Sequence, residues 1–144
     1  MKLYVREPGT GWMIGLANPS NGHTLAILGL ARVEFRAAVR QRERIGDVTH
    51  AVAQELLNAM ERHLHEVYLV QPVTEAVIEE AARLLDRHPL RAYDAMQLAG
   101  CLSLQARLPE ALAFVCADRR LSEAAEREGV TALDPVSQEG PEEQ

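Results

Sequence analysis

The feature that most constrains this chain is the alternation of short apolar segments with segments that have helical periodicity. Four apolar segments are bounded by turn or helix signals: Thr24–Leu28, Val67–Val70, Ala111–Cys116 and Val130–Leu133. Each has the length and composition of a buried strand. Strands that alternate with helices predict an α/β fold with a parallel sheet.

Helices are predicted between these strands from the 3.6-residue spacing of their apolar positions. The expected ranges are about Gly11–Ala17, Leu30–Arg44, Val48–His65, Glu75–Arg87, Arg91–Arg107 and Arg120–Glu128. We expect Asp47 and Thr74 to cap the helices that follow them, and Gly129 to end the last one.

Length and charge restrict the function. The 144 residues fit one domain, which we place at residues 1–136, followed by a disordered acidic tail at 137–144. No apolar run is long enough to span a bilayer, and the first residues lack the apolar stretch of a signal peptide, so we expect a cytoplasmic protein without membrane contact. The net charge of −6 excludes bulk attraction to polyanions. Any nucleic acid must therefore bind at a local site.

Three acids stand among apolar neighbours at strand–helix junctions or helix starts: Glu34, Asp94 and Asp118. Ligands of parallel sheets bind outside the carboxyl ends of the strands, so we expect the three carboxylates to converge there. Clustered carboxylates repel one another unless a cation binds between them, and hard oxygen ligands select Mg²⁺ or Mn²⁺. Taken singly, Asp118 also fits a helix cap, and Glu34 and Asp94 fit the positive start of a helix.

The order of the motifs resembles that of a PIN domain, the nuclease fold of the VapC toxins in type II toxin–antitoxin pairs. The matching segments cover nearly the whole chain: residues 2–9 (KLYVREPG), 33–35 (VEF), 92–95 (AYDA) with Leu98 and Ala99, and 117–121 (ADRRL). The resemblance implies a doubly wound parallel sheet with helices on both faces. It also implies an endoribonuclease that depends on Mg²⁺ or Mn²⁺, with catalytic, metal-binding acids at Glu34, Asp94 and Asp118.

One part of the family pattern is missing. Similar PIN domains begin with a central strand that carries the first acid, and here Met1 falls near the end of that strand. We therefore expect a sheet with a missing middle, flanked by the strands near residues 25–28 and 113–117, and a poor nuclease. A start assigned too far downstream and a decayed or regulatory relic are both open explanations; the intact remaining acids favour the first.

Two functions remain open from the sequence. The first is a VapC-like toxin that cleaves RNA, is neutralised by a VapB-like antitoxin and forms a homodimer. The second is a non-catalytic PIN-like module that retains dimer or antitoxin contacts. Arg119 and Arg120 lie beside Asp118, where an RNA phosphate would bind. A second basic feature, the stripe Arg32, Arg36, Arg40 and Arg44, either grips phosphates or forms a solvated face that balances nearby acids, and we favour the latter.

Overall fold

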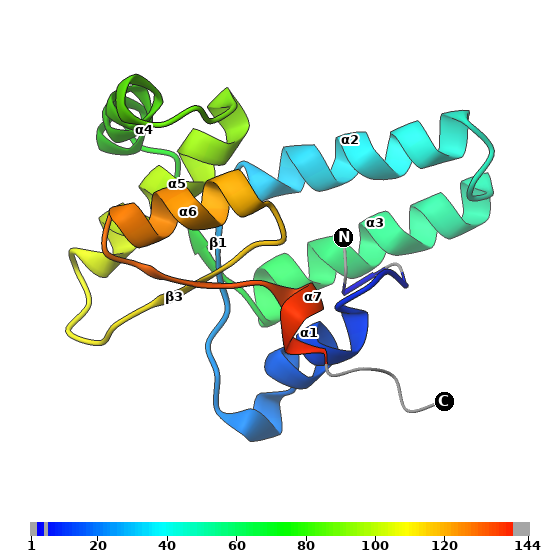
Figure 1. Ribbon diagram of the computed structural model, residues 1–144. Coiled ribbons are helices and arrows are strands. Elements are labelled where there is room, and N and C mark those ends of the chain that lie inside the picture. Colours follow the sequence, from blue (N-terminus) through cyan, green and yellow to red (C-terminus); the bar gives the residue numbers. More distant parts are fainter. Residues whose placement is uncertain (1–2, 5, 140–144) are drawn as a thin grey trace.

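A computed structural model describes residues 3–4 and 6–139 of the 144-residue chain. The described residues form an α/β arrangement of α-helices around four short strands (Figure 1). The helices are α1 (Thr10–Ala17), α2 (Ala31–Arg44), α3 (His50–Glu66), α4 (Glu75–Arg87), α5 (Ala92–Gln105), α6 (Arg119–Arg127) and α7 (Pro135–Gln138), with a 3-10 turn η1 at Pro19–Asn21. The predicted fold class is thus confirmed at the level of α/β.

The strands pair in parallel but form two separate sheets. β1 (Ala26–Leu28) pairs with β2 (Leu69–Gln71), and β3 (Ala113–Val115) pairs with β4 (Thr131–Leu133). We expected a sheet that lacks its central strand, and a continuous five-stranded sheet would have contradicted this expectation. The described part of the chain contains no such sheet. The doubly wound PIN-like sheet itself is not established by these two strand pairs.

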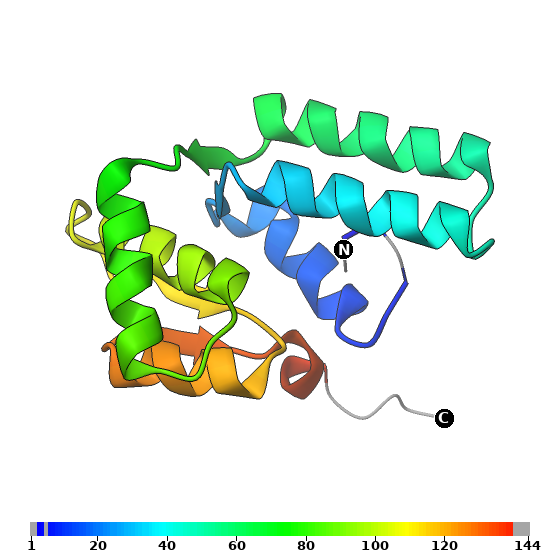
Figure 2. The same cartoon turned by 90° about the horizontal axis from the view of Figure 1, so that it is seen from above.

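Two buried clusters hold the elements together. The larger one joins β1, α4, α5 and α6 through fully buried side chains such as Val77, Leu84 and Leu98, and Phe114 of β3 packs against it. The smaller one lies between α2 and α3, around Phe35 and Val39. Figures 1 and 2 show α2 and α3 side by side as a long pair that extends away from α4, α5 and α6. The clusters therefore separate a helical hairpin from the body that carries α5 and α6.

Four of the α-helices in the described part of the chain, α3, α4, α6 and α7, begin at a side chain that caps the first turn. Thr74 Oγ1 accepts a hydrogen bond from the Val77 amide at the start of α4, as expected. The expectation for Asp47 is wrong, because Thr49 Oγ1 caps α3 by accepting from Val52. The hydroxyl of Thr49 stands directly at the first turn, whereas Gly46 and Asp47 belong to the turn after α2. Gly129, with a φ of 83°, follows α6 as predicted.

The two ends of the described chain meet. The carboxylate of Glu139 accepts hydrogen bonds from the backbone amides of Gly9, Gly11 and Trp12 at the start of α1. A carboxylate there complements the positive end of the helix. Helix α7, which sequence periodicity did not predict, brings Glu139 into place. Of the tail expected at 137–144, residues 140–144 lie outside the described residues.

No helix among the described residues combines the length and the apolar character needed to cross a membrane.

Candidate functional site

Asp118 lies between β3 and α6 and serves as the cap of that helix. Its Oδ1 accepts a hydrogen bond from the Leu121 amide at 3.0 Å, and its backbone is extended, as expected of a cap residue. The side chain is exposed. Asp118 thus has the role of a helix cap that the sequence suggested, and the hydrogen bond to Oδ1 fixes the orientation of its carboxylate.

Asp94 lies in the first turn of α5, where it is partly buried. Burial raises the pKa of its carboxyl, and the negative charge of Asp118 raises that pKa further. The positive charge of Arg91 and a hydrogen bond from the Arg91 backbone act in the opposite direction. The two acids are therefore close enough to repel each other, although they come from helices on opposite sides of β3 in the sequence.

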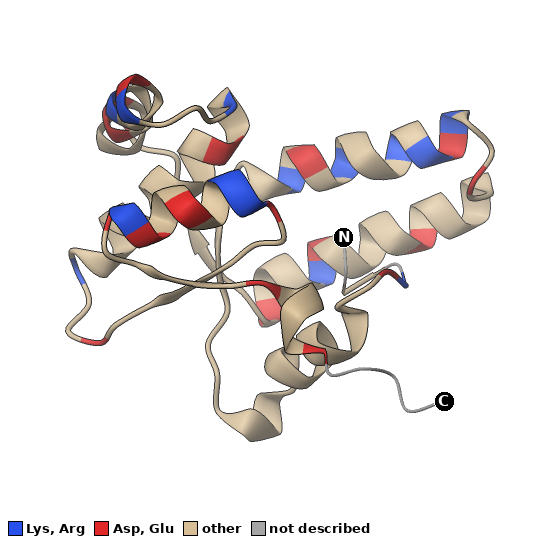
Figure 3. Cartoon of the chain, in the orientation of Figure 1, with Lys and Arg blue, Asp and Glu red and all other residues tan. Residues whose placement is uncertain are grey.

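Asp94 and Asp118 line one pocket of about 330 Å³. Its other lining residues are Pro89, Leu90, Arg91, Arg119 and Arg120. Two carboxylates and three guanidinium groups thus share a small open space at the starts of α5 and α6. Figure 3 shows acidic and basic segments intermixed in this region. The structure brings together four of the five predicted site residues.

Glu34, the fifth predicted residue, does not line this pocket. It lies in the first turn of α2 and interacts with the hydroxyl of Tyr93, the residue before Asp94. Burial raises the pKa of Tyr93, and the neighbouring Glu34 carboxylate adds to the increase. The Gln97 side chain also bonds the Tyr93 hydroxyl. Glu34 is therefore linked to α5 through Tyr93, and its direct participation in one shared metal site stays a prediction.

Three of the four arginines of the α2 stripe form ion pairs, with two glutamates between them. Arg32 and Arg36 both pair with Glu61 of α3, at 2.7 and 3.6 Å. Arg40 pairs with Glu43 at 2.7 Å. These contacts support the interpretation of the stripe as a solvated face whose charge is partly balanced by nearby acids.

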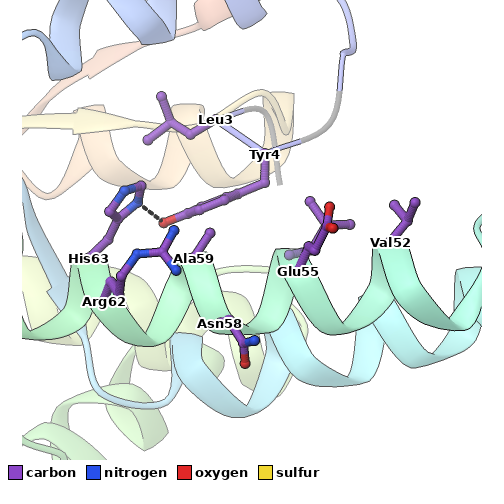
Figure 4. A pocket seen from close by; sticks show the side chains of 9 residues that line it. Leu3, Tyr4, Val52, Glu55, Asn58, Ala59, Arg62 and His63 are labelled. Atoms are coloured by element: carbon purple, nitrogen blue, oxygen red, sulfur yellow. Dashed lines mark hydrogen bonds between the residues drawn. The ribbon is translucent and has the colours of Figure 1, made fainter.

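A larger pocket of about 560 Å³ lies between the N-terminal segment and α3 (Figure 4). Its polar centre is the Tyr4 hydroxyl, which is 2.7 Å from His63 Nδ1 and 2.9 Å from the Tyr68 hydroxyl. Burial and the bond to Tyr68 raise the pKa of Tyr4, so the hydroxyl stays protonated. Tyr4 also packs edge-on against Phe35. This network attaches the N-terminal segment to α3 and lacks paired acids, so size alone does not make it the candidate site.

The acid pair has the chemistry of a divalent cation site. A Mg²⁺ ion is commonly held by one or two carboxylates, with water and substrate phosphates as its remaining ligands. Asp94 and Asp118 fit that requirement. Burial and then the charge of Asp118 raise the pKa of Asp94, and a cation between the two carboxylates would offset the second effect. Within residues 3–4 and 6–139, no group of three or more His, Cys, Asp or Glu side chains is gathered tightly enough to hold one ion. Two carboxylates are thus the ligand set that the described residues offer.

Sequence analysis missed two residues at this site, Arg91 and Tyr93. Arg91 lies three positions before Asp94, a spacing that puts it near the same face of a helix start. Tyr93 directly precedes Asp94 but does not itself line the pocket. Its link to Glu34 depends on how α2 and α5 meet, and no local sequence signal carries that information.

No model of a known protein family matches the chain, and no curated protein matches it.

Proposed function

We propose that this chain is a metal-dependent endoribonuclease of the PIN type that acts as a toxin. The observation that carries the proposal is that Asp94 and Asp118 line one pocket together with three arginines. Repelling carboxylates beside cationic side chains favour a site for a divalent cation together with a phosphate-containing substrate. RNA as the substrate comes from the resemblance of the motifs.

Each residue has a distinct task in this proposal. Asp94 and Asp118 would hold Mg²⁺ or Mn²⁺, and Asp118 is already oriented by its bond to the Leu121 amide. A bound cation of this kind supplies activation of water and stabilisation of charge on the phosphoryl group. Arg119 and Arg120 would bind phosphate oxygens from the first turn of α6, where the helix start adds favourable dipoles. Glu34 would contribute through water or through the position of Tyr93.

The biological setting belongs to the proposal as well. A VapB-like antitoxin would neutralise the toxin, the active form would be a homodimer, and the protein would act in the cytoplasm. These three elements are supported by the motif resemblance and by the sequence pattern described above.

A second candidate is a non-catalytic PIN-like module that binds RNA or a protein partner. One observation favours it: only two acids line the pocket, while Glu34 lies at Tyr93. A site with fewer ligands would bind the cation weakly and orient the attacking water poorly. We expect the chain to be a slow enzyme for the same reason.

The deciding experiment compares the parent chain with Asp94→Asn and Asp118→Asn. RNA cleavage is measured with Mg²⁺, with Mn²⁺ and with a chelator. We expect each substitution to lower metal-dependent cleavage by on the order of a hundredfold, the usual loss when one stabilising group is removed from a charged transition state. Asp86→Asn is the matched control, because Asp86 is exposed on α4 and lies outside the pocket.

Cleavage by Asp94→Asn at the parent rate would refute the site. RNA binding by the parent chain without any metal-dependent cleavage would instead support the non-catalytic module.

A further inference from the structure

We propose that Arg91 binds a phosphate of the substrate strand on the α5 side of the acid pair, opposite Arg119 and Arg120. This inference rests on the proposed function and adds a substrate-positioning residue to it. It predicts that the bound strand crosses the pocket from the start of α5 to the start of α6.

The position of Arg91 is the first support. It is the residue directly before α5, with an extended backbone, and its side chain lines the pocket beside Asp94. Its charge is close enough to lower the pKa of Asp94, against the effect of Asp118. The guanidinium group is therefore held next to the acid pair, where a phosphate bound to a cation would lie.

The second support is that Arg91 has hydrogen-bond donors to spare. Within the described part of the chain its guanidinium forms no ion pair, although it is exposed beside two acids. Arg87, four residues earlier, contrasts with it: its guanidinium bonds both Glu80 and Glu128, at 3.1 to 3.2 Å. An arginine without a carboxylate partner presents its planar fork to other anions, and phosphate oxygens match that geometry.

The arginines at the start of α6 also have guanidinium groups with few carboxylate partners. Arg119 is 89% exposed and makes only a long contact of 3.6 Å with Glu123, and Arg120 has no ion pair among the described residues. The pocket is thus lined by arginines from the starts of both helices, Arg91 before α5 and Arg119 and Arg120 in α6, together with the two acids. A polyanion with regularly spaced phosphates would meet cationic groups at both helix starts, so a strand suits this lining better than a single phosphate does.

The backbone before Arg91 is anchored, which reduces the entropy lost on binding. The Leu90 amide donates to the His88 carbonyl at 2.8 Å. His88 is buried, and its Nε2 lies 2.6 Å from Oε1 of Glu128, the residue that directly follows α6. The segment that carries Arg91 is therefore attached to the end of α6, the helix whose first turn carries Arg119 and Arg120.

The test compares Arg91→Gln with Arg107→Gln, a control at the opposite end of α5. Arg107 is also exposed, and its side chain bonds only the Ser103 carbonyl. Binding of a labelled single-stranded RNA is measured by fluorescence anisotropy in chelator across a salt titration, and cleavage is measured with Mg²⁺ or Mn²⁺.

For Arg91→Gln we expect binding to weaken by about tenfold, the value of one charge-assisted contact. The slope of log affinity against log salt should fall by about 0.7, as for one lost phosphate contact on a single strand. In cleavage, KM should rise more than kcat falls. Arg91→Lys should restore part of the binding, because the charge remains, but less than the parent because the bidentate fork is lost.

Binding and salt slope equal to those of Arg107→Gln would overturn the role of Arg91 while leaving the proposed function intact. A changed pH profile of kcat with unchanged KM and salt slope would also overturn it, because Arg91 would then act only on Asp94. A parent chain that neither binds nor cleaves RNA would refute both proposals together.

Discussion

At the scale of single residues, the central feature is one carboxyl whose ionisation is disfavoured. The pKa of Asp94 is raised by burial and by Asp118, so its charged form is less stable in the folded chain than in the unfolded chain. The stability that Asp94 contributes is fully present below the ordinary Asp pKa of about 3.9 and is lost as the pH rises through the raised value. At neutral pH, the acid pair therefore opposes folding.

Asp94→Asn should accordingly raise the free energy of unfolding at neutral pH. The amide keeps the acceptor for the Arg91 backbone and removes the repulsion with Asp118. We expect a gain below about 1 kcal/mol, because solvent screens a partly exposed pair. Denaturant unfolding at neutral pH and again below about pH 3.9 measures it, and the gain should vanish in acid. A change in the free energy of unfolding that is the same at both pH values would show that the two carboxylates do not repel each other.

The sequence identified those site residues whose role follows from their immediate neighbours in the chain. Asp94 and Asp118 were identified because an acid at the start of a helix is a local pattern, and Asp118 also lies directly after a strand. Arg91 and Tyr93 were missed because their roles depend on neighbours from α2 and α6, which no local pattern specifies.

At the scale of elements, one buried histidine connects α4 to α6. His88 follows α4, is 8% exposed, and has Nε2 bonded to Glu128, while its Nδ1 has no partner in the described part of the chain. The bonds from His88 and then Arg87 hold the pKa of Glu128 below its usual value. A lowered carboxyl pKa contributes stability above the unfolded value of about 4.3 and loses it as the pH falls further.

Glu128→Ala should lower the free energy of unfolding by about 1–3 kcal/mol, because it leaves the buried imidazole Nε2 without a partner. Glu128→Gln keeps an acceptor for that nitrogen and should cost less. Denaturant unfolding at neutral pH ranks the two variants. The difference in the free energy of unfolding between the parent chain and Glu128→Gln should shrink below about pH 4. A pH-independent difference would mean that packing, and not the charge of Glu128, holds α6 to His88.

Element boundaries were predictable where a side chain caps a helix directly, as with Thr74 and Asp118. Asp47 was the wrong choice because two candidate caps stand close together and only one reaches the first turn. Helix α7 was missed because a single turn has no periodicity, and its place depends on the Glu139 contact with α1.

At the scale of the whole molecule, the division of the strands into two pairs is the main finding. Alternating patterns predict strands and helices, but the neighbours of each strand depend on residues far apart in sequence. On either side of β1, the Leu25 carbonyl and the Gly29 amide form hydrogen bonds with β2. Because alternate residues of a strand bond on opposite sides, the amide of Ala26 faces the other edge. In β3, Cys116 N bonds β4, so the backbone of Ala113 also faces away from its partner.

Hydrogen exchange tests this arrangement. The amides of Gly29 and Cys116, which bond the neighbouring strands, should exchange at least about a hundredfold more slowly than those of Ala26 and Ala113. NMR-detected exchange in deuterated buffer measures all four. Equal protection would indicate that the two pairs join into one sheet in solution, contrary to the structure described here.

Paramagnetic broadening by Mn²⁺ tests whether Asp94 and Asp118 form one divalent cation site. Amide NMR signals are followed in the ¹⁵N-labelled chain as Mn²⁺ is added, with Asp94→Asn as the comparison. We expect signals from the first turns of α5 and α6 to broaden first, signals from α3 to stay sharp, and Asp94→Asn to abolish the effect. Broadening centred on other acids, or unchanged broadening in Asp94→Asn, would contradict this site.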